Sequence, residues 1–374
     1  MISQRAGSLA RISVGAARRD GRLLAAAFAL AMIWIVAGHA VFAEEPAREE
    51  PVAVAAEPIE NSAAARVAAA WKRGLPLIEK AAASYPTHRK CFSCHHQTLP
   101  MLSLVCAQDA GIAENEPLLK AQAEFTHQSF QAQLEDLRAG QGIGGRALTV
   151  GYGLWALSLA KWPADETTQA MVAYLLKTQK EDGHWEGQAK RPPMEESFAT
   201  CTVLAVAGMR HFADPAQKDE LDAAVAKAKT WLIQRIPDSQ EDKVARLWGL
   251  HLLAATEEQR SAAREAVLTA QRDDGGWSQT AAMESDAYAT GSTLFVLRST
   301  GLAATDPAFR RGREFLLKTQ QADGSWLVES RSKPIQVYFD NGDPHGKNQF
   351  ISTPAACWAL AALALGQERR EAPR

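Results

Sequence analysis

Apolar residues recur at helical spacing along most of the chain, in pairs of segments that differ in character. The first segment of a pair is amphipathic and charged on one side, as in 171–180 and 315–321. The second is rich in Ala, Gly, Ser and Thr, as in 197–209, 244–255, 286–297 and 353–365. Since small side chains let helices approach closely, the second segments are expected to form an inner ring of helices and the charged segments an outer ring.

A turn motif, Gln-x-x-Asp-Gly-x-Trp, occurs three times, at 179–185, 271–277 and 320–326. The Gly after Asp allows a positive φ where the outer helix ends, the Gln ties the turn backbone together, and the Trp packs beneath the next unit. A degenerate unit at 231–238 fits between the first two turns. Two further pairs lie upstream, 64–83 with 95–110 and 118–137 with 147–160. The sequence therefore predicts an all-α protein, an α/α-toroid of about six inner and six outer helices.

The three turns resemble the QW repeats of squalene-hopene and oxidosqualene cyclases. Residues 61–365 resemble the toroid domain that these enzymes share with protein prenyltransferases. The resemblance implies their fold, but the Asp-x-Asp-Asp, Asp-Asp-x-x-Asp and prenyltransferase zinc motifs are absent from the sequence. What remains is Ser285-Asp286 followed by Ala289-Thr290, which is similar to the acid segment of oxidosqualene cyclases and implies Asp286 as a catalytic acid. The alternative is that Asp286 caps the helix that follows it.

The N-terminus has the pattern of an export signal. Arginines precede an apolar run at 23–37, and Val41 and Ala43 are small residues at the positions that a signal peptidase reads. We predict a signal peptide at 1–43, a flexible Ala/Pro/Glu linker at 44–60, the squalene cyclase-like toroid at 61–365 and a tail at 366–374. The protein is then periplasmic or otherwise exported. An uncleaved N-terminal membrane anchor is the alternative.

The sharpest local motif is Cys91-Phe92-Ser93-Cys94-His95. Cys-x-x-Cys-His is the attachment signature of haem c: two thiols add to the porphyrin vinyl groups, and the adjacent imidazole ligates the iron. The predicted cofactor site is Cys91, Cys94 and His95, with His95 as the metal ligand. Three alternatives stay open: a disulfide, a zinc site that also uses His95 or His96, and a purely structural turn. The candidates for a sixth iron ligand are Met101, His127, His184 and His345.

In a ring of helical pairs every inner helix begins at the same face, so residues near these starts are expected to surround one mouth. The predicted pocket residues are Tyr152, Glu195, Glu196, Phe198, Tyr288 and His345, with the long loop 333–352 as a lid. A net charge of −2, with both signs interspersed, argues against a nucleic-acid partner. The expected partners are a hydrophobic small molecule or a redox protein, with membrane-surface association also possible.

Three functions follow from these features. The first is an exported haem c protein that acts in electron transfer or redox sensing. The second is a terpenoid or isoprenoid cyclase-like enzyme that uses Asp286 as the acid. The third is a non-catalytic toroid that binds a hydrophobic ligand or a protein and holds zinc or a disulfide at Cys91 and Cys94.

Overall fold

A computed structural model of the chain describes residues 62–367. Within these residues the regular structure is helical, apart from an isolated antiparallel bridge between Arg191 and Glu195. The predicted signal peptide and linker lie outside the described residues, as does most of the predicted tail. No helix of the described part is both long and apolar enough to cross a membrane.

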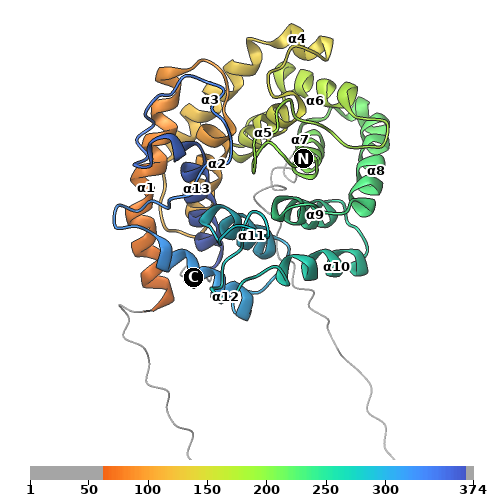
Figure 1. Cartoon of the computed structure of the whole chain (residues 1–374). Coiled ribbons are helices and arrows are strands. Elements are labelled where there is room, and N and C mark those ends of the chain that lie inside the picture. The colour runs from red at the N-terminus through yellow and green to blue at the C-terminus, as the bar shows by residue number, and fades with distance from the viewer. Residues whose placement is uncertain (1–61, 368–374) are drawn as a thin grey trace, which may run out of the picture.

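The helices form two concentric rings (Figure 1). Each inner helix contacts its neighbours in chain order, and the last contacts both the fifth and the first. The ring therefore closes, and the prediction of an all-α toroid with six inner and six outer helices is confirmed. The inner helices are α2 (Leu99–Asp109), α5 (Arg146–Leu159), α7 (Phe198–Phe212), α9 (Gln240–Leu252), α11 (Ala287–Ser299) and α13 (Gln349–Leu365). The outer helices are α1 (Ala63–His88), α3 (Glu116–Gln131), α6 (Glu166–Thr178), α8 (Lys218–Gln234), α10 (Glu257–Leu268) and α12 (Pro307–Thr319).

The observed helix bounds depart from the sequence pattern in three places. The segment 118–137 is interrupted after α3, and a short helix, α4 (Leu134–Ala139), ends at Gly140, which has a φ of 76°. Helix α9 begins four residues before the apolar pattern does, because the hydroxyl of Ser239 caps it by accepting a hydrogen bond from the Asp242 amide. Helix α13 likewise begins early, at Gln349, and contains Pro354.

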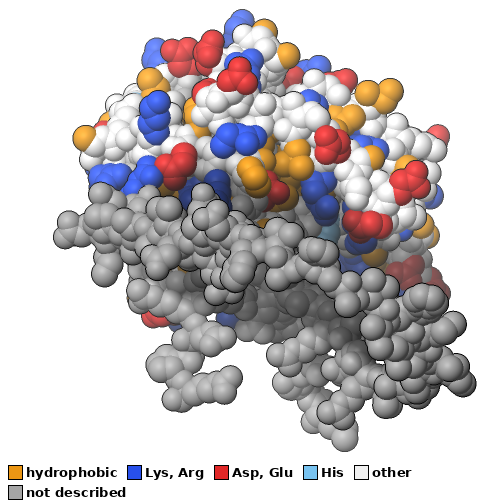
Figure 2. Space-filling view, turned by 90° about the horizontal axis from the view of Figure 1, so that it is seen from below, with side chains coloured by type: hydrophobic (Ala, Val, Ile, Leu, Met, Phe, Trp, Pro, Cys, Tyr) orange, Lys and Arg blue, Asp and Glu red, His pale blue; other side chains and the backbone are white. Residues whose placement is uncertain are grey.

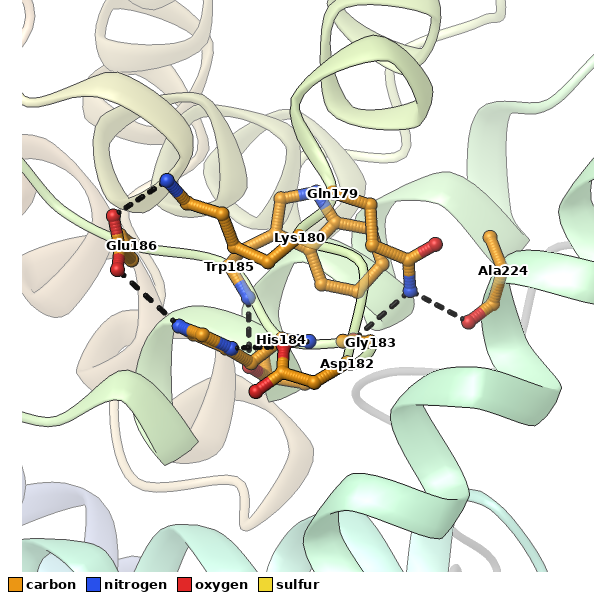
Figure 3. Close-up of polar contacts among 9 residues, drawn as sticks. Gln179, Lys180, Asp182, Gly183, His184, Trp185, Glu186 and Ala224 are labelled. Atoms are coloured by element: carbon orange, nitrogen blue, oxygen red, sulfur yellow. Dashed lines mark hydrogen bonds and ion pairs between the residues drawn. The ribbon is translucent and has the colours of Figure 1, made fainter.

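The repeated turns share one set of hydrogen bonds, and Figure 3 shows polar contacts of the first turn. In the first turn the side-chain amide of Gln179 donates to the carbonyl of Gly183 at 2.9 Å and to that of Ala224, in the next outer helix, at 2.8 Å. The indole of Trp185 is fully buried and donates to the carbonyl of Leu175 at 2.7 Å. Each turn therefore joins its own helix to the next outer helix. Equivalent bonds are made by Gln271 and Trp277 and by Gln320 and Trp326.

The third turn closes the ring against α1, the first outer helix. Gln320 donates to the carbonyl of Ala70 at 3.0 Å, and Trp71 of α1 donates to the carbonyl of Leu360 in α13 at 3.1 Å. Gly324 has a φ of 90°, and a Cβ placed on it would lie 2.2 Å from the Arg73 carbonyl oxygen. Only glycine fits this approach, because its backbone lacks the Cβ that would meet α1.

Inside the ring, aromatic side chains from four inner helices pack together. Trp155 of α5 lies 5.1 Å from Trp248 of α9 and 6.1 Å from Trp358 of α13, and Phe295 of α11 lies 5.2 Å from Trp358. This cluster joins the inner helices across the ring. On the outside, Figure 2 shows Lys and Arg side chains interspersed with Asp and Glu over the visible part of one face, which presents no single-sign patch to a polyanion.

Candidate functional site

The starts of the inner helices are joined by side-chain hydrogen bonds at one face of the ring. Thr200 of α7 donates to a carboxylate oxygen of Glu241 in α9, and Tyr288 of α11 donates to the other oxygen. Farther along this face, Ser197 donates to Asp242 at 2.6 Å. These contacts place the first turns of three inner helices around a common mouth.

The Cys-x-x-Cys-His segment lies in the connection from α1 to α2. Cys91, Phe92 and Ser93 follow the end of α1, and Cys94–Thr98 forms a single π-helical turn that leads into α2. Cys91, Cys94 and His95 all line one hollow of about 510 Å³. Its apolar wall includes Phe92, Phe130, Ile143, Ile335 and Phe350, and its polar wall includes Gln133, Gln188, Arg191 and Glu195.

Burial favours the uncharged forms of Cys94 and His95. Burial raises the pKa of the Cys94 thiol, the nearby Glu195 raises it further, and Arg191 opposes the shift. Burial also lowers the pKa of His95 to about 3, with a smaller effect from Arg191. A neutral imidazole has a lone pair available for a metal ion. The Cys91 sulfur lies 3.5 Å from the Tyr85 hydroxyl.

The neighbouring His96 ties this segment to the long loop of the last repeat. Its ring is buried and stacks on Tyr85 with 4.6 Å between the ring centres. The Asn341 amide donates to Nε2 at 3.0 Å, which places the imidazole proton on Nδ1, 3.1 Å from the Ser93 hydroxyl. Burial lowers the pKa of His96, as this neutral form requires. His96 therefore fixes the backbone on both sides of Cys94 and His95.

Two loops meet over the mouth. The loop between α6 and α7 carries Arg191 and Glu195, whose side chains pair at 2.9 Å beside Cys94. The loop between α12 and α13 crosses to it, since Ser332 donates to the carbonyl of Pro192 at 2.8 Å and Arg331 lies 3.6 Å from Glu196. Residues 334–336 of this second loop line the hollow. The loop that the sequence suggested as a lid thus lies beside the Cys-x-x-Cys-His segment.

Glu241 is the most perturbed carboxyl group at the mouth. The Thr200 hydroxyl donates to one of its oxygens at 2.8 Å and the Tyr288 hydroxyl to the other at 3.2 Å. Burial raises its pKa to about 7, although both hydrogen bonds oppose the shift. The charge of Glu241 in turn contributes to the raised pKa values of Tyr152 and Tyr288. A carboxyl group that is half protonated near pH 7 can donate or accept a proton there.

Asp286 caps α11. One carboxylate oxygen accepts the Ala289 amide at 2.9 Å, and the other accepts the side-chain amide of Gln279 at 3.1 Å. Arg331 donates to Gln279 in turn, so Asp286 is connected to Glu196 through two side chains. Burial raises the pKa of Asp286, and its hydrogen bonds oppose the shift. One oxygen of Asp286 thus caps α11, as the N-cap alternative predicts.

Of the predicted pocket residues, Glu195 lines the hollow beside Cys94. The carbonyl of Tyr152 accepts a hydrogen bond at 3.0 Å from the hydroxyl of Thr98, which closely follows the Cys-x-x-Cys-His segment, and Tyr288 bonds to Glu241 at the mouth. Phe198 and His345 lie elsewhere. The Phe198 ring is partly exposed and stacks on His184 of the first turn, 5.3 Å between centres. The His345 Nε2 lies 2.9 Å from the Ser325 hydroxyl in the third turn.

None of the candidate sixth iron ligands lines the hollow. Met101 is fully buried in α2, and His127 lies 2.8 Å from Asp165 on the outer ring. His184 bonds to Asp182 and Glu186 within its own turn (Figure 3).

The five cysteines of residues 62–367 differ in burial. All five are free thiols, and Cys106, Cys201 and Cys357 are buried. No group of three or more His, Cys, Asp and Glu side chains within residues 62–367 is arranged to hold a metal ion. The arrangement at Cys91, Cys94 and His95 therefore offers one imidazole and two thiols without a fourth protein ligand.

Comparison with known proteins identifies the fold. No family model matches the chain. Lanosterol synthase of Candida albicans is 27% identical over 166 residues, which cover 36% of this chain and 22% of that enzyme. The match thus spans less than a quarter of the curated relative. The type II terpene cyclase MstE from Scytonema superposes with a TM-score of 0.50 at 16% identity, over 80% of this chain and 98% of that one. A protein from Actinoplanes superposes with the same TM-score at 15% identity, over 80% and 99% of the two chains. The chain has a terpene cyclase-like fold.

Two residues of the mouth escaped sequence reasoning. Glu241 follows the degenerate repeat, which lacks the turn motif that precedes α7, α11 and α13. The sequence does place Glu241 two residues after Ser239, a residue type that caps helices, and so at the start of an inner helix. Arg191 lies in a loop without periodicity, and its approach to Cys94 depends on how that loop crosses the mouth.

Proposed function

We propose that this chain is an exported toroid protein that carries a covalent haem c at Cys91, Cys94 and His95 and acts in electron transfer or redox sensing. The observation that carries the proposal is that these three side chains line the same hollow in the mouth of the ring. The spacing is the one that thioether attachment and axial ligation need. When bound, haem c supplies one-electron chemistry.

The residues around the hollow suit such a group. Phe92, Phe130, Ile143 and Phe350 supply apolar surface for a porphyrin, and the volume lies within the range of pockets that hold cofactors. The neutral His95 is in the state that ligates iron. Arg191 adds a cation on the wall that suits a propionate.

Export is part of the proposal, because attachment of haem c takes place outside the cytoplasm. It rests on the N-terminal pattern in 1–43, with a membrane anchor as the alternative arrangement. The partner is then a redox protein or a hydrophobic small molecule that reaches the mouth.

A second candidate function is acid catalysis on a terpenoid or isoprenoid substrate, and the pKa of Glu241 favours it. Glu241 suits the role of the acid better than Asp286, because one Asp286 oxygen is held by the backbone amide of Ala289, whereas both partners of Glu241 are hydroxyl groups, whose protons can reorient. Protonated Glu241 would donate its proton to the substrate, and the Thr200 and Tyr288 hydroxyls would orient it.

The test is expression in a host that exports proteins and attaches haem c, followed by a haem stain and a pyridine haemochrome spectrum on denatured protein. We expect a stained band that persists in Cys106→Ala, a matched control at a buried thiol on the next helix. Cys91→Ala with Cys94→Ala should abolish it, and His95→Ala should change the iron spectrum. Unstained protein from a host that matures a control cytochrome would contradict the haem proposal. Bound zinc or a disulfide in that sample would support the non-catalytic alternative, while turnover of a polyprenyl substrate that is lost in Glu241→Gln would support the second candidate.

A further inference from the structure

Exposed apolar side chains gather on the loop that covers the mouth. Six large hydrophobic side chains are exposed in residues 62–367, and four of them lie in the connection from α12 to α13. We call residues 335–338 the apolar tip. The Val337 side chain is 81% exposed and the Ile335 side chain 65%. Neighbouring exposed apolar side chains of this kind mark interaction sites. The six are Phe198, Ile236, Leu327, Ile335, Val337 and Tyr338.

The tip is held on a fixed base. Before it, Ser332 donates to the carbonyl of Pro192 at 2.8 Å. After it, Phe339 is buried and stacks on His88 with 4.8 Å between the ring centres. Arg89 donates to the carbonyl of Val337 and places its guanidinium 5.1 Å from the Phe339 ring. The tip therefore projects from an anchored base. Ile335 borders the hollow on one side, and most of the Ile335 and Val337 side chains is nonetheless exposed.

Cations flank the tip. Arg89 contacts the carbonyl of Val337 and the Phe339 ring, and Lys333 lies two residues before Ile335 without an ion pair within the described residues. Of the nearby carboxylates, Glu195, which lines the hollow together with Ile335, is paired with Arg191 at 2.9 Å, and Asp340 follows the base. Surfaces that enter the headgroup region of an anionic bilayer combine apolar and aromatic side chains with flanking Lys and Arg, as this tip does.

We propose that the apolar tip inserts into the surface of an anionic membrane and so brings the mouth of the ring to the lipid. A protein interface fits the observations less well, because such interfaces need a large surface with matched charges, and the tip is a small projection of three apolar side chains. The proposal does not depend on haem, since it rests on the loop alone.

The first test is co-sedimentation of the protein with vesicles made of equal parts phosphatidylcholine and phosphatidylglycerol, and with vesicles of phosphatidylcholine alone. We expect preferential binding to the anionic vesicles and a loss of roughly tenfold or more in partitioning for the double change Ile335→Ser and Val337→Ser. Ile236→Ser is the matched control, because Ile236 is as exposed as Val337 but lies on the connection between α8 and α9. It should bind as the unchanged protein does.

A second measurement locates the insertion even if the N-terminus also binds lipid. Tyr338→Trp should show fluorescence quenching by brominated lipids beyond that of the unchanged protein, and Ile236→Trp should not. Absence of binding to anionic vesicles, equal binding by the double variant, or an unquenched Tyr338→Trp would each overturn the proposal. So would a self-association in solution that the double variant abolishes without any vesicle binding. The haem absorbance of the unchanged protein reports separately on the proposed function, because Ile335 borders the proposed haem hollow.

Discussion

Substitution of Gly324 by Ala should destabilise the protein through one contact, the approach of the third turn to α1. The backbone of Gly324 has a φ of 90°, and an added Cβ would lie 2.2 Å from the carbonyl oxygen of Arg73. Gly301 is a matched control, because its φ is 102° and nothing lies within 4 Å of the position its Cβ would take. The two variants share the conformational cost of a positive φ, and they differ in the clash with α1.

The shared conformational cost is about 1–2 kcal/mol, partly offset by the lower entropy of the unfolded alanine variants. The clash in Gly324→Ala adds an overpacking cost of about 1–3 kcal/mol, because a helix carbonyl cannot move without shifting α1. Urea unfolding of both variants, followed by circular dichroism, measures the difference in unfolding free energy. Equal destabilisation of the two variants would show that the third turn does not press on α1, and the closed ring would then be wrong.

Two further predictions concern carboxyl groups at the mouth. The folded pKa of Glu241, about 7, lies above its ordinary value of 4.5, so its contribution to stability is present below pH 4.5 and is lost as the pH rises through 7. Glu241→Gln should therefore make the unfolding free energy fall less between pH 5 and 8, by at most about 3 kcal/mol. The control is Glu258→Gln at an exposed position. If the two variants have the same pH profile of unfolding free energy, the raised pKa of Glu241 is wrong. Asp242→Asn should cost about 2 kcal/mol by urea unfolding, because it weakens the pair of the buried Asp242 with the partly exposed Arg235 at 2.9 Å. Asp238→Asn, which breaks an exposed pair with the same arginine, should cost less than about 1 kcal/mol, and equal costs would refute this reasoning.

Local repeats made most of the fold predictable. The Gln, Gly and Trp of each turn make the contacts that their chemistry suggests, and small residues do mark the inner helices. The start of α9 was missed because the apolar pattern begins after the cap at Ser239. The bonds between each Gln and the next outer helix, such as Gln179 with Ala224, join residues far apart in the sequence, so no local pattern predicts them.

The candidate site was predictable where the chemistry is consecutive in sequence and not where the fold assembles it. Cys91, Cys94 and His95 were recognised from their spacing alone. Burial raises the pKa of Glu241. Its two hydrogen-bond partners, Thr200 and Tyr288, come from two other inner helices. A local sequence pattern does not predict this burial. Glu241 differs from an ordinary surface glutamate only in the assembled ring.

The measurement that tests the haem proposal most directly is the mass of one tryptic peptide. Trypsin cleaves after Lys90, and the next Lys or Arg is Lys120. Residues 91–120 are therefore released as a single peptide that begins at Cys91. Protein matured in an export-competent host that attaches haem c should yield this peptide with the added mass of one haem, and fragmentation should place it on Cys91 and Cys94. An unmodified peptide, from a preparation in which a control cytochrome carries its haem, would contradict the account.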